Sequence, residues 1–152
     1  MIGLARAGLL RVLGDVFAEV LVPGEVAREC TREGHRPGAG AIRQAIDESL
    51  LTVRDVSPSD VLTDLATVLD RGEAEALLLA DALGVPVLMD DRKGRAAARH
   101  LGVRVIGTGA VLVAAKGRGS LGAVAPALAR LRDEGYQLSD QLVRRILELA
   151  GE

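Results

Sequence analysis

The segment over residues 72–93 constrains the fold of this 152-residue chain more than any other. It reads as a helical pattern with acidic residues at its start, a glycine stop, a short apolar run, and then Asp90 and Asp91. A helix followed by a buried strand in this order is typical of a parallel α/β sheet. Ligands of open α/β sheets bind beyond the carboxyl ends of the strands, where the two aspartates fall. The segment therefore predicts an acidic site that holds a cation.

Helical and extended patterns alternate along the rest of the chain. Helical patterns cover residues 4–13, the segment after Pro23 and Gly24, and residues 41–49, 60–69, 73–83, 93–100, 110–116, 123–134 and 138–150; extended patterns lie within 16–22, 50–56, 85–89 and 103–106. Residues 34–40 are rich in glycine and predict a loop. The alternation predicts an α/β fold with a parallel sheet, and the last two helical patterns predict a helical hairpin over 120–152.

Composition excludes two classes of protein. Charged residues make up 26% of the chain and hydrophobic residues 49%, which argues against a disordered chain and against a membrane protein. No apolar run approaches the roughly 20 residues that cross a bilayer. The N-terminal residues lack a signal-peptide pattern. We expect a single domain over residues 1–152, located in the cytoplasm.

Charge and cysteine content limit the remaining classes. A net charge of −2 provides no general attraction for nucleic acid, so any contact with nucleic acid has to be local. Cys30 is the only cysteine, which excludes an internal disulfide and a cysteine-rich zinc site. We interpret Cys30 as a small packing residue. His35 and His100 belong to no metal-ligand spacing and are interpreted as surface residues.

Glutamates near the start of two helical patterns are further candidate ligands. Glu73 and Glu75 lie in a first helical turn, where acids also interact favourably with the helix dipole. Because they are two residues apart, they point in different directions; Glu73 is the better ligand, and Glu75 forms an ion pair or supports the ligands. Glu25 and Glu29 are four residues apart and share one helix face. Either both are solvated beside nearby arginines, or one of them joins the acidic site.

Asp90 and Asp91 allow two interpretations. One aspartate at the start of a helix is explained as an N-cap, but two exceed what one cap needs. Clustered carboxylates repel one another, and a divalent cation relieves that repulsion. Oxygen ligands suit Mg²⁺ or Mn²⁺, and such ions promote phosphodiester hydrolysis. The basic residues that follow either bind phosphates or form a solvated helix face. They are Arg92, Lys93, Arg95, Arg99 and Arg104.

Residues 72–93, together with residues 103–108 and with Leu21, Val22 and Pro23, resemble the PIN-domain superfamily. The resemblance covers nearly the whole chain and is greatest to a prokaryotic branch whose members are often paired with small antitoxins. It implies a three-layer α/β/α fold around a central parallel sheet, and an acidic ribonuclease site that depends on Mg²⁺ or Mn²⁺. It also implies RNA as substrate and a small antitoxin protein as partner; a homodimer is a further candidate.

The PIN site draws on four acids, and the resemblance assigns three of them here. The helical acid after an early strand falls on Glu29, the acid that opens a later helix on Glu73, and the acid after the following strand on Asp91. Asp90, beside it, is an alternative or additional ligand. The substrate-binding candidates are Arg92, Lys93 and Arg95.

The first of the four acids has no counterpart in this chain. PIN domains begin with a hydrophobic strand that ends in an aspartate, whereas residues 1–5 resemble the region just after that aspartate. Three explanations are open: a start codon assigned too late, a fragment, or a protein that has rearranged or lost activity.

The sequence leaves three functions to be separated. The leading prediction is a PIN-type, metal-dependent ribonuclease that acts as the toxin of a toxin–antitoxin pair. The alternative is a catalytically impaired PIN-like protein that binds RNA or a partner without cutting it. The third is an unrelated α/β protein in which the acids cap helices and the C-terminal hairpin mediates dimerisation.

Overall fold

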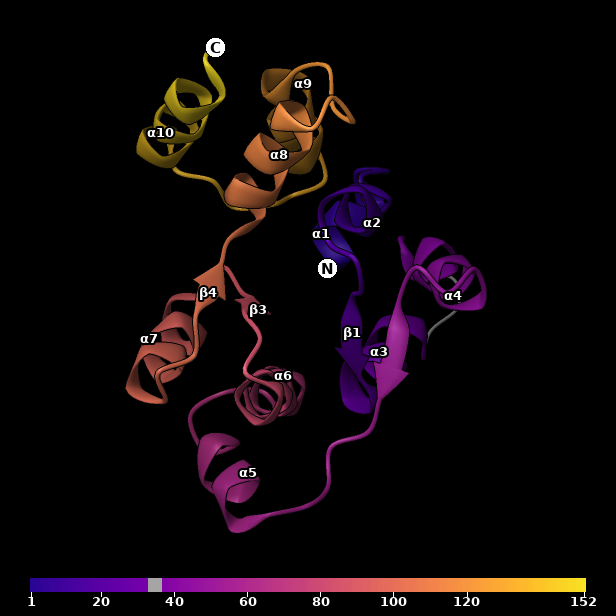
Figure 1. Cartoon of the computed structure of the whole chain (residues 1–152), viewed down its shortest axis with the longest axis vertical. Helices are drawn as coiled ribbons and strands as arrows, with labels where there is room; N and C mark the ends of the chain where they lie inside the picture. Colours follow the sequence, from indigo (N-terminus) through magenta and orange to yellow (C-terminus); the bar gives the residue numbers. More distant parts are fainter. Residues whose placement is uncertain (33–36) are drawn as a thin grey trace. The chain divides into compact units, whose positions relative to one another are not determined.

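A computed structural model of the chain describes residues 1–32 and 37–152 (Figure 1). His35 and part of the predicted 34–40 loop lie outside the described residues. The chain divides into two compact units, each made of separate stretches of sequence. The first unit contains residues 1–20, 30–52 and 109–152; the second contains residues 21–29 and 53–108. The expectation of one domain over residues 1–152 stays a prediction.

Short helices and strands alternate as expected (Figure 1). In chain order they are α1 (Ile2–Arg6), α2 (Val12–Val16), β1 (Leu21–Pro23), α3 (Gly24–Thr31), α4 (Ala39–Asp47), β2 (Thr52–Arg54), α5 (Asp60–Leu65), α6 (Arg71–Leu83), β3 (Val87–Leu88), α7 (Arg92–His100), β4 (Val105–Ile106), α8 (Thr108–Gly117), α9 (Val124–Asp133) and α10 (Asp140–Ala150). The longest described helix, α6, has 13 residues. No helix in the described ranges is long and apolar enough to cross a membrane.

The strands form two pairs within the described part of the chain. Strand β1 pairs with β2, and β3 pairs with β4. The β3–β4 pair is parallel, with Val87 opposite Val105 and Leu88 opposite Ile106. Helix α7 connects these two strands and contacts β4, as a βαβ unit requires (Figure 1). The predicted α/β class and its parallel pairing are confirmed, although the strands are shorter than the apolar runs that indicated them.

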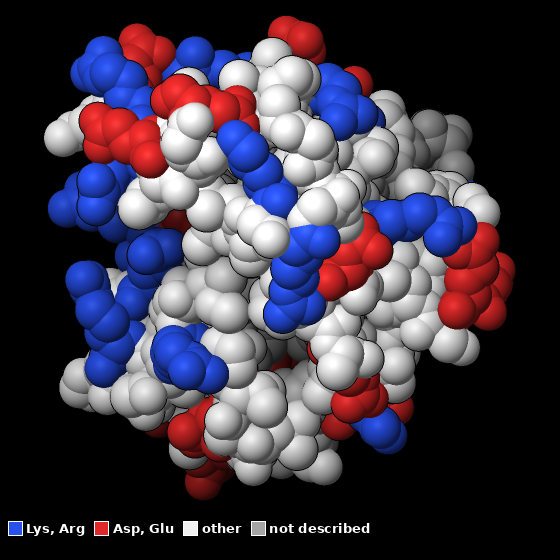
Figure 2. All heavy atoms as spheres, turned by 45° about the horizontal axis from the view of Figure 1, so that its top comes forward, with Lys and Arg blue, Asp and Glu red and all other residues white. Residues whose placement is uncertain are grey.

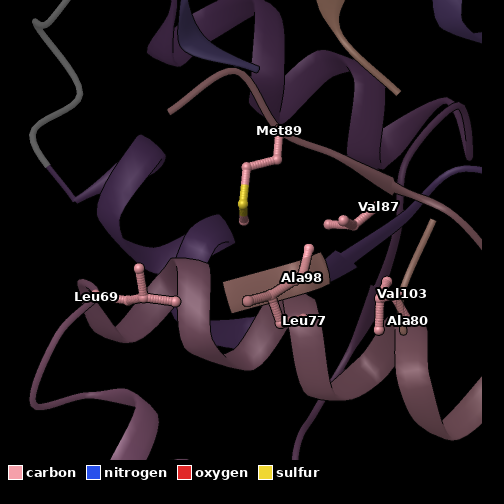
Figure 3. Close-up of a cluster of buried hydrophobic side chains, with 7 residues drawn as sticks. All are labelled: Leu69, Leu77, Ala80, Val87, Met89, Ala98 and Val103. Carbon is pink, nitrogen blue, oxygen red and sulfur yellow. The ribbon is translucent and has the colours of Figure 1, made fainter. Parts of the chain in front are cut away.

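A hydrophobic cluster holds the second unit together (Figure 3). Leu77 on α6 and Ala98 on α7 are completely buried, and Val87 and Met89 come from β3 and the residue after it. The cluster is built from aliphatic side chains and one methionine, as the 1% aromatic content requires. Its members are Leu69, Leu77, Ala80, Val87, Met89, Ala98 and Val103. Because α6 and β3 both contribute, the cluster holds the residues just before Asp90 next to the acid-headed helix.

Gly94 is needed for close packing in this cluster. A Cβ atom at residue 94 would collide with the sulfur atom of Met89 and lie 3.1 Å from its Cγ. Glycine therefore lets α7 approach the end of β3 more closely than any other residue would.

Side-chain caps explain several helix boundaries. Ser59 accepts a hydrogen bond from Leu62 N–H and begins α5, as predicted, and Gly84 ends α6 in the left-handed conformation. Helix α6 begins two residues earlier than expected, because Asp70 caps it. The helix predicted over residues 4–13 is wrong: the chain turns at Gly8, where φ is +67°, and separates α1 from α2. Gly14 lies inside α2 instead of ending a helix.

The C-terminal hairpin of the first unit is confirmed, and Glu152 joins its two ends. Ala123, the N-cap of α9, provides no side-chain cap. The carboxylate of Glu152 instead accepts hydrogen bonds from Val124 N–H at 2.7 Å and Ala125 N–H at 2.9 Å. It also accepts one from Lys116 Nζ at 2.8 Å. The first N–H groups of a helix have no partner within the helix, so this carboxylate replaces a local cap.

We predict that Leu77→Ala lowers the free energy of unfolding by about 2–5 kcal/mol, because it removes a completely buried side chain from the cluster. The matched control is Leu83→Ala on the same helix, where the side chain is 52% exposed. The control should change stability by no more than about 0.5 kcal/mol. Urea unfolding of both variants measures the difference, and equal losses would contradict the assigned core.

We also predict that Glu152 stabilises the folded protein in a pH-dependent way. Its hydrogen bonds with Lys116, Val124 and Ala125 lower the pKa of its carboxyl from 4.5 to about 2. The stabilisation is therefore complete above pH 4.5 and disappears as the pH falls toward 2. Thermal melts should show Glu152→Gln melting below the parent at pH 7, with the gap closing in acid. A gap that does not change with pH would contradict this assignment.

Candidate metal centre

The candidate site lies entirely within the second unit and begins at the start of α6. Asp70 Oδ1 accepts a hydrogen bond from Glu73 N–H at 2.7 Å. An aspartate N-cap followed three residues later by glutamate has the spacing of a capping box. The cap fixes the first turn of α6 and leaves the Glu73 side chain half-buried beside Asp70. Sequence reasoning missed Asp70, although this spacing could have indicated it.

A close approach between α3 and α6 brings Glu29 to the same place. Gly72 is buried, and a Cβ atom there would lie 2.9 Å from Val26 Cγ2 and 3.1 Å from Glu29 Oε2. These distances are shorter than ordinary contacts, so glycine at residue 72 makes room for the Glu29 carboxylate. Two predicted site residues that are far apart in sequence therefore meet at one helix end.

The pKa values of both glutamates reflect this crowding. Burial raises the pKa of Glu73, and the charges of Asp70, Asp91 and Glu29 raise it further. Burial also raises the pKa of Glu29, together with the charges of Asp70, Glu25 and Glu75. Each carboxylate is destabilised in its charged form by losing water and by its acidic neighbours. A cation held between them would relieve both effects.

Asp90 and Asp91 have different surroundings. Asp91 caps α7 through Oδ2, which accepts Gly94 N–H at 2.8 Å. Both oxygens of Asp90 bind Thr108: Oδ1 accepts the backbone N–H at 3.0 Å, and Oδ2 accepts the hydroxyl at 2.6 Å. Asp91 is exposed and close enough to influence the pKa of Glu73, whereas Asp90 ties the end of β3 to the start of α8. From sequence, Thr108 was used only as part of the 103–108 resemblance and was given no role.

The basic residues after Asp91 differ in how firmly they are held. Arg95 Nη1 donates a hydrogen bond to the backbone oxygen of Met89 at 3.3 Å. Arg92 and Lys93 are exposed at the start of α7, and their side chains make no hydrogen bond or ion pair with the residues that the structure describes. Acidic and basic side chains are interspersed on the face seen in Figure 2. Contact with a polyanion is therefore expected to be local.

The donor chemistry of this region fits a hard divalent cation. Glu29, Glu73 and Asp91 supply only oxygen atoms, which Mg²⁺ and Mn²⁺ prefer. Within residues 1–32 and 37–152, no three carboxylate, histidine or cysteine side chains lie close enough to hold one ion together. Mg²⁺ commonly binds through one or two carboxylates and completes its coordination with water and substrate phosphate. Glu73 with Glu29, or Glu73 with Asp91, would supply the two carboxylates that such a Mg²⁺ site needs.

Comparison with known protein families shows to which family this chain belongs. The model of the PIN-domain family DUF3368 matches the chain over residues 1–152. The chain is a PIN domain. No curated protein and no solved structure matches it. PIN domains form a nuclease-type superfamily whose members generally bind RNA and use divalent metal ions. The assignments of individual ligands in this PIN domain stay predictions.

We predict that Glu73→Gln raises the thermal stability of this PIN domain at pH 7 in the absence of metal. Because the folded-state pKa of Glu73 lies above 4.5, the folded protein holds the proton more tightly than the unfolded chain. The Glu73 carboxylate therefore destabilises the folded protein increasingly as the pH rises above 4.5. Thermal melts from pH 4 to pH 8 should show a higher melting temperature for Glu73→Gln than for the parent, and this difference should vanish in acid.

The control is Asp81→Asn, an exposed residue of the same helix whose side chain makes no hydrogen bond or ion pair within the described ranges. This change should leave the pH profile of the melting temperature unaltered. A Glu73→Gln variant that melts below the parent at pH 7 would contradict the crowding of the acidic site.

Proposed function

We propose that this PIN domain is a metal-dependent ribonuclease that hydrolyses RNA phosphodiester bonds. One observation carries the proposal: Glu29 and Glu73, from different helices, share the start of α6, where burial and neighbouring acids raise the pKa of each. A fold gains no stability from such an arrangement. Perturbed carboxylates of this kind are typical of functional sites.

In this proposal Glu29, Glu73 and Asp91 are the candidate ligands of Mg²⁺ or Mn²⁺: Glu73 would hold the ion together with Glu29 or with Asp91, and water and substrate phosphate would complete its coordination. When bound, the ion activates water and stabilises the leaving oxygen of the phosphodiester. Asp91 uses one oxygen to cap α7 and keeps the other for the site. Asp90 contributes by holding the β3 end against Thr108, and we assign it a supporting role.

The start of α7 is the proposed binding place for the RNA backbone. Arg92 and Lys93 are exposed immediately after Asp91, and Arg and Lys make most protein contacts to phosphate. Arg95 would act mainly by fixing the turn after β3, because it already binds the oxygen of Met89. The partner we propose is a small antitoxin protein in the cytoplasm, which makes the chain the toxin of the pair; a homodimer is a further proposal.

Cleavage of a fluorescent single-stranded RNA in Mn²⁺ tests the activity. Asp91→Asn keeps the helix cap, because asparagine caps as well as aspartate, but removes the charge. We predict that it lowers the rate of cleavage by roughly 10²-fold or more, and that EDTA abolishes cleavage by the parent. Asp81→Asn is the control and should cut like the parent. An Asp91→Asn variant with parental activity would contradict the assigned site.

A second candidate is a PIN domain that binds RNA without cutting it. The observation that favours it is that no three potential ligand side chains in the described residues form one group. Such a protein would bind the same RNA in a filter assay, lose binding in Arg92→Ala, and release no fragments at any Mn²⁺ concentration.

A further inference from the structure

Glu75 is a buried carboxylate that the proposed reaction does not use. Its side chain is 3% exposed, in the second turn of α6. Oε1 accepts a hydrogen bond from Arg71 Nε at 3.2 Å, one turn earlier on the same helix, and the Arg71 side chain is 59% exposed. Oε2 accepts the backbone N–H of Glu25 at 3.3 Å. Both oxygens therefore have partners, and neither faces solvent.

The ion pair with Arg71 does not account for this burial. Removing a carboxylate from water costs several kcal/mol, and an ion pair with a largely exposed arginine recovers little of it. An exposed glutamate would form the same pair with Arg71 without that cost. The contact that requires Glu75 to point inward is the one with α3.

The contact with Glu25 lies at the start of α3. The first N–H groups of a helix have no partner within the helix, and a carboxylate there also interacts favourably with the helix dipole. Helix α3 begins at Gly24, so the N–H of Glu25 is one of these groups. Glu75 thus supplies, from α6, a hydrogen-bond acceptor for the N-terminus of α3.

Glu75 and Gly72 act on the same neighbour. They are three residues apart on α6 and so lie on one face of that helix. Glu75 accepts the N–H of Glu25 in the first turn of α3, and Gly72 makes room for Val26 in that turn and for Glu29 in the next one. These two contacts bring α3 against the first turns of α6 and place the Glu29 carboxylate near Gly72, at the start of α6.

We propose that Glu75 is a positioning residue: by binding the N-terminus of α3 it sets Glu29 beside Glu73. The expected effect of Glu75 on metal binding rests on the function proposed above. The expected effect of Glu75 on the packing of α3 does not depend on that function. Glu75 is not itself a ligand in this proposal, because it is buried and both its oxygens are engaged.

Two substitutions of Glu75 separate positioning from stability. Glu75→Gln retains an oxygen that accepts the Glu25 N–H, whereas Glu75→Leu has a similar volume and no acceptor. Because the Arg71 side chain is 59% exposed, Glu75→Leu leaves no buried charge without a partner, so the leucine variant is expected to fold. Thermal melts of both variants establish this before any other measurement.

The first measurement needs neither metal nor activity. In the parent, NMR should show a nuclear Overhauser contact between a Val26 methyl group and Gly72 Hα, together with slow exchange of the Glu25 amide proton. Glu75→Gln should retain both signals, and Glu75→Leu should lose both while still melting in one cooperative transition. A folded leucine variant that retains both signals would overturn the proposal.

The second measurement is Mn²⁺ affinity by titration calorimetry, followed by RNA cleavage. Glu75→Leu should weaken Mn²⁺ binding by roughly 10- to 100-fold, as the loss of residues that support metal ligands typically does, and should lower kcat with KM for RNA unchanged. Glu75→Gln should stay close to the parent in all three values. If the leucine variant binds Mn²⁺ as the parent does, Glu75 does not position the ligand. If the parent itself neither binds Mn²⁺ nor cleaves RNA, the proposed function fails, and the NMR result alone decides the positioning role.

Discussion

The contact between α3 and the first turns of α6 is the constraint on which the candidate site depends. It exists because residue 72 is a glycine and because Glu75 binds the N-terminus of α3. The contact has a cost, since it gathers the charges of Glu29, Asp70 and Glu73 in a partly buried place. Packing of the opposite face of α6, centred on Leu77, supplies the free energy that offsets this cost.

Helix capping and the candidate chemistry share Asp91 in this fold, and other aspartates that bind helix starts lie beside it in the chain or beside Glu73. Asp70 caps α6, Asp91 caps α7, and Asp90 binds the first residue of α8. A cap orients a carboxylate through one oxygen and leaves it next to the positive end of a helix dipole. Capping therefore does not compete with a functional role for Asp91; it holds the side chain at the start of α7, next to Arg92 and Lys93.

Asp90 illustrates how neighbouring residues acquire different roles. Adjacent residues at the end of a strand point in different directions, so Asp90 and Asp91 meet different surroundings. Thr108, which is 97% buried, takes both oxygens of Asp90, and the nearby Gly107 leaves room for that carboxylate. The result is a rigid link between β3 and the β4–α8 turn. It holds Asp91 in place without competing for the cation proposed here.

Local signals in the sequence determined much of the secondary structure. The Ser59 cap, the Gly84 stop and the acid-headed helix α6 were predictable, because capping and chain reversal depend on residues only a few positions apart. The same local signals indicated the α/β class and the PIN-domain relationship. They failed at the N-terminus, where the apolar spacing of residues 4–13 fits one helix but Gly8 takes a positive φ and divides it.

Only the tertiary structure decided which acids meet. Glu25 and Glu75 are 50 residues apart, and Asp90 and Thr108 are 18 apart, so no local pattern records these contacts. Sequence alone identified Glu29, Glu73 and Asp91 as candidate ligands and gave Glu75 an ion-pair or supporting role, but it left Asp90 as an alternative or additional ligand. The distinction between a ligand and a supporting residue depends on burial and on which donor each oxygen finds, and both are set by the packing of α3, α6 and the β3–β4 pair.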